Sequence, residues 1–214
     1  SSAASDVYKR QKESFLLHQY PENRIFVNPY GVDLSMFKPL PNIPKKYDVI
    51  MVGGWGYEKG CDLIVEAIRK TNYSFIHVGS IKDVDFPQEK NFTHIDPVDQ
   101  SKLIEYYNQA KVFILPSRQD GFGMVLSQAL ACNLPIIGSN NCGAPDLKKM
   151  VELPEYITII KDYTADAIVT AIHTAIKNYE QLGERIYAGN AIENLTWEAY
   201  GKRYANFLHK IIKQ

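Results

Sequence analysis

The sequence predicts an α/β protein built on a doubly wound parallel sheet of the Rossmann type. Short apolar segments typical of buried strands alternate along the chain with longer segments that have helical amphipathic spacing. This alternation favours parallel strands joined by right-handed helical crossovers. One apolar segment is followed at once by a glycine-rich loop that opens a helix, and parallel sheets bind phosphate groups at such a junction.

The composition limits the class of protein. The chain has 214 residues, of which 45% are hydrophobic and 22% charged, enough for one α/β domain with a real core and appended segments. The 24 basic and 24 acidic residues balance, so we expect no nucleic-acid partner. No apolar run reaches the roughly 18 residues of a membrane span. Three cysteines without C-x-x-C spacing favour free thiols and a cytoplasmic protein.

The first part of the chain differs from the rest. We expect a short polar helix over residues 5–20, a turn at 20–23 and a short strand over 24–28. Proline-rich segments at residues 28–33 and 38–44 then predict a stiff connector or hinge.

The compact α/β unit begins near residue 46. Its expected strands cover residues 47–53, 73–79, 91–95, 112–115, 134–138 and 156–160. Its expected helices cover residues 61–70, 101–110, 124–132 and 165–179. A final amphipathic helix over 196–213, with an aromatic stripe on one face, closes the chain.

Residues 120–137, DGFGMVLSQALACNLPII, and residues 142–147, CGAPDL, resemble the donor-site signature of family-4 glycosyltransferases, which have the GT-B fold. Residues 52–67, VGGWGYEKGCDLIVEA, resemble a second motif of that family. Residues 21–39 are similar to the end of its first domain and linker, and Trp197-Glu198-Ala199-Tyr200 to its closing helix.

The resemblance implies that the chain is the C-terminal, donor-binding half of a GT-B fold. Residues 1–45 would be the end of the N-terminal domain with the interdomain linker. Residues 46–195 would bind the nucleotide-sugar, and residues 196–214 would form a helix that crosses back to the first domain. The partners implied are a nucleotide-sugar donor, an unknown acceptor and the chain's own N-terminal domain.

The resemblance also assigns site residues. Lys59 would contact the donor diphosphate and Asp120 the sugar hydroxyls, and these two are the expected catalytic residues. A cation suits the first role because the leaving diphosphate gains negative charge, and glycines let the backbone approach the ligand closely. The expected substrate-binding residues are Gly53, Gly54, Arg118, Gly121, Phe122, Gly123, Met124, Val125 and Gln128.

The chain departs from the family's pattern at three positions. Gly54 stands where the family usually has arginine, so another base, with Arg118 as a candidate, would have to supply the second cation. Asp120 replaces a glutamate, and it could also cap the following helix. Gln128 replaces the acid that binds ribose, although an amide can still pair with a diol.

The predicted function is transfer of a sugar from a nucleoside-diphosphate sugar to an acceptor, with retention at the anomeric carbon implied by the family. The expected setting is bacterial surface polysaccharide or glycoconjugate synthesis, in the cytoplasm or at the inner face of the membrane, with peripheral membrane association of the full-length protein. The resemblance implies no cofactor and no required metal. The D-x-D triplet Asp83-Val84-Asp85 is short enough to arise by chance.

Two alternatives remain. A dinucleotide-binding Rossmann domain would need G-x-G-x-x-G after the first strand, whereas Gly60 falls at the wrong interval after Gly53-Gly54-Trp55-Gly56. The domain could instead bind a nucleotide or a protein partner without turnover, which the three departures would suit.

Overall fold

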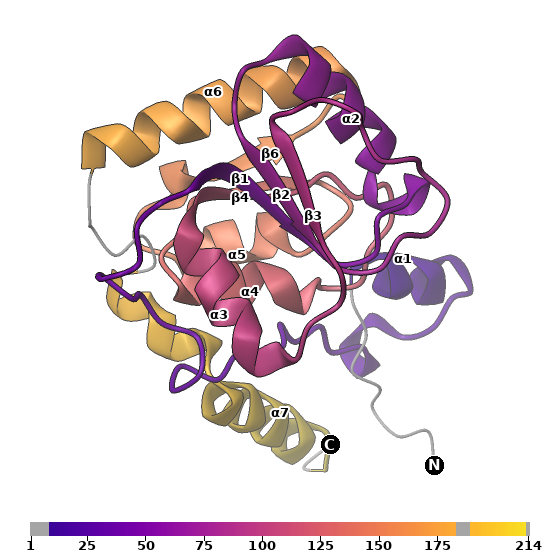
Figure 1. Cartoon of the computed structure of the whole chain (residues 1–214). Helices are drawn as coiled ribbons and strands as arrows, with labels where there is room; N and C mark the ends of the chain where they lie inside the picture. The colour runs from indigo at the N-terminus through magenta and orange to yellow at the C-terminus, as the bar shows by residue number, and fades with distance from the viewer. Residues whose placement is uncertain (1–8, 183–188, 213–214) are drawn as a thin grey trace.

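The computed structural model describes residues 9–182 and 189–212. Six parallel strands form one sheet in the order β3-β2-β1-β4-β5-β6 (Figure 1). This is the doubly wound order of a Rossmann-like fold, so the predicted fold class is confirmed. The strands are β1 (Tyr47–Val52), β2 (Phe75–Val78), β3 (Phe92–Ile95), β4 (Ala110–Leu115), β5 (Ile136–Ser139) and β6 (Ile157–Ile160).

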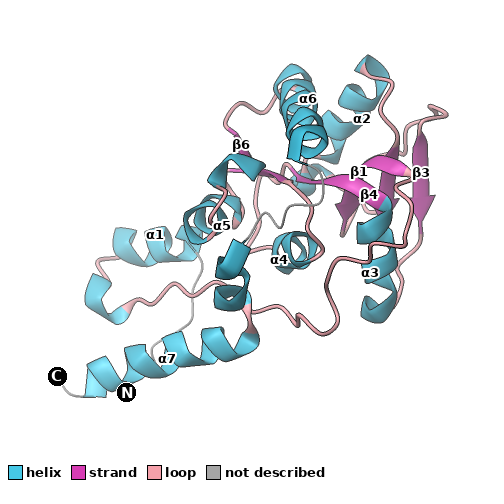
Figure 2. Ribbon diagram, turned by 90° about the vertical axis from the view of Figure 1, so that its left-hand side faces the viewer, coloured by secondary structure: helices cyan, strands magenta, loops and turns pink. Residues whose placement is uncertain are grey.

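Helices cover both faces of the sheet (Figure 2). The helices on one face are α2 (Cys61–Lys70) and α6 (Ala165–Leu182), which pack against each other. The helices on the other face are α3 (Gln100–Gln109), α4 (Met124–Ala131) and α5 (Ala144–Met150). Because both faces are covered, the strands β1, β2 and β4 are almost wholly buried apolar runs.

The local sequence explains why α2 forms where the pattern predicts it. Leu63, Ile64, Ala67 and Ile68 recur at helical spacing and are all buried against the sheet and α6. Arg69 and Lys70 occupy the last turn, where positive charge suits the helix dipole. The helix therefore spans the residues expected from the sequence.

Two expectations for secondary structure were wrong. Residues 24–28 do not form a strand of the sheet; a 3-10 turn, η1 (Glu22–Arg24), is followed by extended chain. The side chains of this segment pack against the last helix: Phe26 stacks on Phe207, and Asn28 Nδ2 donates to the carbonyl oxygen of Tyr200. The helix α5 was not expected, because residues 142–147 look like a glycine loop.

The two ends of the described chain form a layer beside the sheet unit (Figure 2). The helix α1 (Lys9–Leu17) lies in this layer, and residues 5–8 of the expected first helix lie outside the described residues. The last helix, α7 (Trp197–Ile212), packs on residues 26–32: Phe26 stacks on Phe207 at 4.5 Å, and Arg203 Nε donates to Asn28 Oδ1 at 2.7 Å.

The remaining elements are short 3-10 turns: η2 (Tyr57–Lys59), η3 (Pro154–Tyr156) and η4 (Gly189–Leu195). None of the helices in the described part of the chain is both long enough and apolar enough to cross a membrane. The domain boundaries at residues 45/46 and 195/196 remain predictions.

Candidate functional site

The site residues gather where the direction of the strand order reverses. β1 and β4 are neighbours in the sheet, and their following helices α2 and α4 lie on opposite faces. The loops after these two strands therefore diverge and leave a crevice at the carboxyl edge of the sheet, where ligands bind in open α/β folds.

A close backbone approach joins the two loops. Gly60 has φ +74°, and a side chain there would collide with the carbonyl oxygen of Pro116 at the end of β4. Gly60 ends the 3-10 turn that carries Lys59 and begins α2. Only glycine adopts this conformation at this spacing without strain, and the contact brings Lys59 to the β4 loop.

The structure brings the two expected catalytic residues together. Lys59 Nζ lies 2.8 Å from Asp120 Oδ2, and both side chains are mostly but not fully buried. Ser117 Oγ lies 3.4 Å from the same Asp120 oxygen. A lysine ammonium has three N–H donors, so the pair with Asp120 leaves donors on Lys59 that an anionic ligand can use.

Arg118 is held differently. Its guanidinium donates two hydrogen bonds to Asp62, at 2.6 and 2.8 Å, and a third to the carbonyl oxygen of Tyr57 at 2.7 Å. It also stacks over the Tyr57 ring at 3.8 Å. The hydrogen bond to Asp62 raises the pKa of Arg118 above its ordinary value. Its charge is thus matched by Asp62, and the structure does not bring it to the Lys59–Asp120 pair.

Gly123 is the N-cap of α4, and its φ of +73° turns the chain from the loop into the helix. As a glycine, it has no side chain that could cap this N-terminus. The positions around it are open: a side chain at Gly121 would meet nothing within 4 Å, and Met124 is 39% exposed. Exposed amides at the positive end of a helix dipole form a ready site for an anion.

Phe122 and Val125 face away from this opening. Phe122 is fully buried, lies edge-on to Tyr30 at 6.2 Å, and accepts a hydrogen bond at its carbonyl oxygen from the amide of Gly143. Val125 is half-buried against the core. The backbone of Phe122 remains in the loop, but its ring fixes the loop to the linker.

Gln128 lies one turn further along α4 and is 5% exposed. Its Oε1 accepts a 3.0 Å hydrogen bond from the hydroxyl of Tyr107, a fully buried residue whose pKa is raised by burial. This bond uses one of the two lone pairs of Oε1, so the amide can still offer the second lone pair and its N–H donors to a ligand.

Gly53 and Gly54 continue from the end of β1. The carbonyl oxygen of Gly53 lies 2.8 Å from Nε2 of the fully buried His77, which must donate because a carbonyl can only accept. In neutral His77 the other nitrogen then accepts from His94 Nδ1, 2.9 Å away. Burial lowers the pKa of His77 to about 4, which keeps it neutral beneath the loop.

Several polar groups that support the site have no sequence motif. Ser139 Oγ and Tyr163 Oη both donate to the carbonyl oxygen of Ser117, at 2.6 and 3.0 Å. Asn141 Nδ2 donates to Tyr163 Oη, and the backbone carbonyl oxygen of Asn141 accepts from the backbone amide of Asp120. These bonds hold the β4 loop from the β5 side. They could be recognised only once β4, β5 and β6 were placed side by side.

The D-x-D triplet has a structural use. Asp83 Oδ1 accepts a 2.8 Å hydrogen bond from the amide of Tyr57 and so caps the 3-10 turn that carries Lys59. Among residues 9–182 and 189–212, no three histidine, cysteine, aspartate or glutamate side chains gather in a way that could hold a metal ion.

Comparison with known proteins identifies the family. The family described as Glycosyl transferases group 1 matches residues 34–191. The chain therefore belongs to the group 1 glycosyl transferases. Within this class, it is 25% identical over 214 residues to a probable sucrose-phosphate synthase of Thermosipho melanesiensis, an alignment that covers 89% of this chain and 49% of that protein.

Solved structures share the fold. The Anabaena protein HepE in complex with UDP and glucose matches with a TM-score of 0.74 at 15% identity, over 95% of this chain and 62% of that one. The C-terminal domain of a group 1 glycosyl transferase from Francisella tularensis matches with a TM-score of 0.62 at 21% identity, over 76% of this chain and 95% of that domain. The chain thus spans about half the length of its first curated relative.

Proposed function

We propose that this chain is the donor-binding half of a glycosyltransferase that takes a nucleoside-diphosphate sugar and transfers the sugar with retention at the anomeric carbon. The observation that carries the proposal is the Lys59–Asp120 pair beside the N-terminus of α4, whose N-cap residue is the glycine Gly123, at the crevice between the β1 and β4 loops. The fold match to a protein in complex with UDP and glucose supports the choice of ligand class.

Lys59 suits the diphosphate of such a donor, and Asp120 suits its sugar. The remaining N–H donors of Lys59 and the backbone amides at the N-terminus of α4 would bind diphosphate oxygens and stabilise the charge that grows as the diphosphate leaves. Asp120 has carboxylate lone pairs that its bonds to Lys59 and Ser117 do not use, and these would accept hydrogen bonds from sugar hydroxyls.

Gln128 would contact the ribose through its side-chain amide. Tyr107 uses one lone pair of the amide oxygen, so the amide could donate to a ribose hydroxyl oxygen or accept from a ribose hydroxyl through the second lone pair. The acceptor that we propose is a bacterial surface polysaccharide or glycoconjugate, bound by an N-terminal domain in the full-length protein in the cytoplasm or at the inner face of the membrane.

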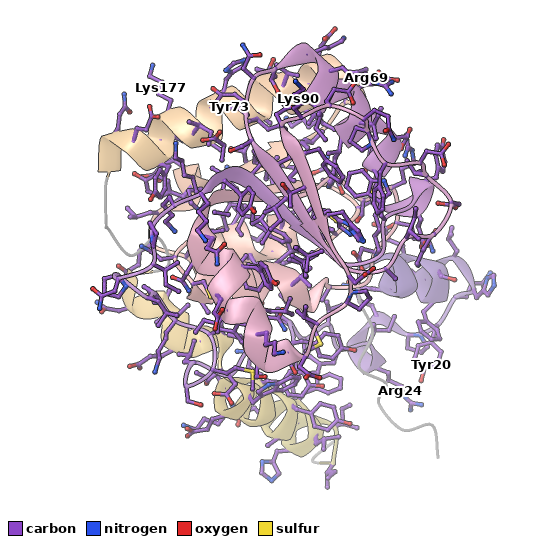
Figure 3. All side chains as sticks on the ribbon, viewed as in Figure 1. Tyr20, Arg24, Arg69, Tyr73, Lys90 and Lys177 are labelled. Atoms are coloured by element: carbon purple, nitrogen blue, oxygen red, sulfur yellow. The ribbon has the colours of Figure 1, made fainter. Side chains whose placement is uncertain are left out.

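Calorimetric titration of the chain with UDP, GDP and ADP tests the proposal. We expect saturable binding of one of them, and loss of that binding in Lys59→Ala but not in the exposed control Lys177→Ala, which lies on α6 away from the crevice (Figure 3). Binding of none of the three nucleotides would contradict the proposal and favour a domain that binds a protein partner without turnover.

A transfer assay tests the second half of the proposal. The crevice would face an N-terminal domain that brings the acceptor, so the isolated chain should bind donor yet transfer little sugar. Transfer by the isolated chain at the rate of the full-length protein would show that the acceptor is bound here instead.

A further inference from the structure

A lysine from the β2 loop fills the space beside Gly54. A Cβ atom added to Gly54 would lie 2.5 Å from Cε, 3.1 Å from Cδ and 3.3 Å from Nζ of Lys82. The side chain of Lys82 therefore runs directly over the point from which a side chain at position 54 would begin. The ammonium group of Lys82, which belongs to the loop after β2, therefore lies beside Gly54 in the loop after β1, one of the two loops that border the crevice.

The backbone fixes Lys82 in this place. The amide of Trp55 donates to the carbonyl oxygen of Ser80 at 2.7 Å, and the amide of Lys82 donates to the carbonyl oxygen of Trp55 at 2.9 Å. Trp55 is itself fully buried, which anchors the pair of bonds in the core. The next residue, Asp83, is tied to the amide of Tyr57. The β1 and β2 loops are thus joined on both sides of Lys82.

The charges around the crevice distinguish Lys82 from the other cations. Lys59 is paired with Asp120, and Arg118 is paired with Asp62. Lys82 is exposed and, within the described residues, has no carboxylate within ion-pair distance. The neighbouring Asp83 directs an oxygen to a backbone amide. An anion entering the crevice would therefore meet an uncompensated positive charge at Lys82.

We propose that Lys82 is the second cation of the donor site and binds the diphosphate beside Gly54. Lys82 would supply from the β2 loop the positive charge that a basic side chain at position 54 would supply from the β1 loop. This inference rests on the proposed function. A side chain at position 54 would have to move the end of the Lys82 side chain aside.

The first test compares Lys82→Ala with Lys90→Ala. Lys90 is also exposed, but it lies before β3 at the amino edge of the sheet, opposite the crevice (Figure 3). The probes are UDP, GDP and ADP with the matching monophosphates. We expect Lys82→Ala to weaken binding of the diphosphate that the wild-type chain takes up by about fivefold to twentyfold, with a smaller effect on the monophosphate. The affinity of Lys82→Ala for the diphosphate should also depend less steeply on salt concentration than that of the wild type.

The second test moves the charge. Gly54→Arg alone should not improve binding, because the new side chain and Lys82 compete for the same space. Gly54→Arg combined with Lys82→Ala should restore diphosphate affinity to within about threefold of the wild type. A merely structural role for Lys82 would not be rescued by a charge on a different loop. Thermal unfolding of each variant checks that it folds.

The outcomes separate the two proposals. If the wild-type chain binds none of the diphosphates, the proposed function and this inference fail together. If the wild-type chain binds one and Lys82→Ala binds it equally well, or if the double variant stays as weak as Lys82→Ala, this inference alone is overturned.

Discussion

Two ion pairs join the segment after β1 to the loop after β4, and they are built differently. Arg118 donates two hydrogen bonds to Asp62 in the first turn of α2 and a third to a backbone carbonyl, and its guanidinium stacks on the ring of Tyr57. Lys59 gives one hydrogen bond to Asp120. The two cations are similarly buried, with side chains 20% and 23% exposed, whereas Asp62 is more exposed than Asp120.

The number of contacts shows which pair has capacity for a ligand. A guanidinium that donates two parallel hydrogen bonds to a carboxylate and a third to the backbone holds the segments that it joins in a fixed position. An ammonium with two donors left, beside a carboxylate with lone pairs left, can exchange partners when a charged ligand arrives. We infer that the Arg118–Asp62 pair mainly stabilises the two loops and the Lys59–Asp120 pair mainly binds.

Gly60→Ala would break both pairs at once. The added methyl group would collide with the carbonyl oxygen of Pro116 in a left-handed conformation that alanine disfavours. We expect a loss of about 3 kcal/mol in the free energy of unfolding, measured by urea denaturation. The control is Gly201→Ala in α7, where a methyl group meets nothing within 4 Å and the helix should gain stability. Equal stability of the two variants would contradict the close approach.

Lys59→Ala should affect binding far more than stability. Removal of a charged donor from a partly buried site should weaken diphosphate binding about tenfold to a hundredfold by calorimetry. Its melting temperature should stay near that of Lys177→Ala. A large loss of stability with unchanged affinity would reverse the roles that we assign to the two pairs.

Acid should loosen the loop after β1, because it rests on His77. The folded-state pKa of His77 is about 4, below its ordinary value of 6.5, so the unfolded chain binds the proton first. The stabilising contribution is therefore present above pH 6.5 and is lost as the pH falls from 6.5 toward 4. This residue alone should cost roughly 1.4 kcal/mol of unfolding free energy between pH 7.5 and 5.5.

Denaturation at both pH values measures this effect. His77→Gln should remove most of the pH dependence, since glutamine does not titrate, whereas the exposed control His209→Gln should retain it. The same acid-induced loss in His77→Gln and in the wild type would exclude His77 as its source.

Arg118→Ala should give the smallest effect, and on stability only. In a double-mutant cycle with Asp62→Ala we expect a coupling energy of about 1 kcal/mol, modest because both side chains keep some exposure to solvent. Diphosphate affinity should change by less than about threefold. A loss of affinity as large as that of Lys59→Ala would make Arg118 a ligand contact, as the sequence alone suggested.

The fold was predictable where one side-chain pattern determines one element. The stripe of Leu63, Ile64, Ala67 and Ile68 predicts α2, and the buried runs predict the strands of a parallel sheet. The pattern failed over residues 24–28, because a short apolar run shows that a segment is covered but not which element covers it. In the structure this segment contacts α7. It also failed at α5, whose two buried side chains, Ala144 and Leu147, form no stripe.

The candidate site was predictable in part for a similar reason. Lys59 and Asp120 follow neighbouring strands, and parallel strands end at one edge of the sheet, so sequence motifs suffice to bring them together. Their roles stay predictions. Lys82, His77 and Tyr163 carry no motif, and their places depend on which loops lie side by side. The engagement of Arg118 with Asp62 likewise depends on side-chain geometry.

The packing of α7 on residues 26–32 has a consequence for the order of folding. The hydrogen bond from Asn28 to the carbonyl oxygen of Tyr200 joins residues 172 positions apart. Closing so long a stretch of chain costs more conformational entropy than any strand pairing within the sheet. The sheet should therefore form first and the terminal layer last. In hydrogen exchange, the amides of α7 should open at a lower free energy than those of β1 and β4.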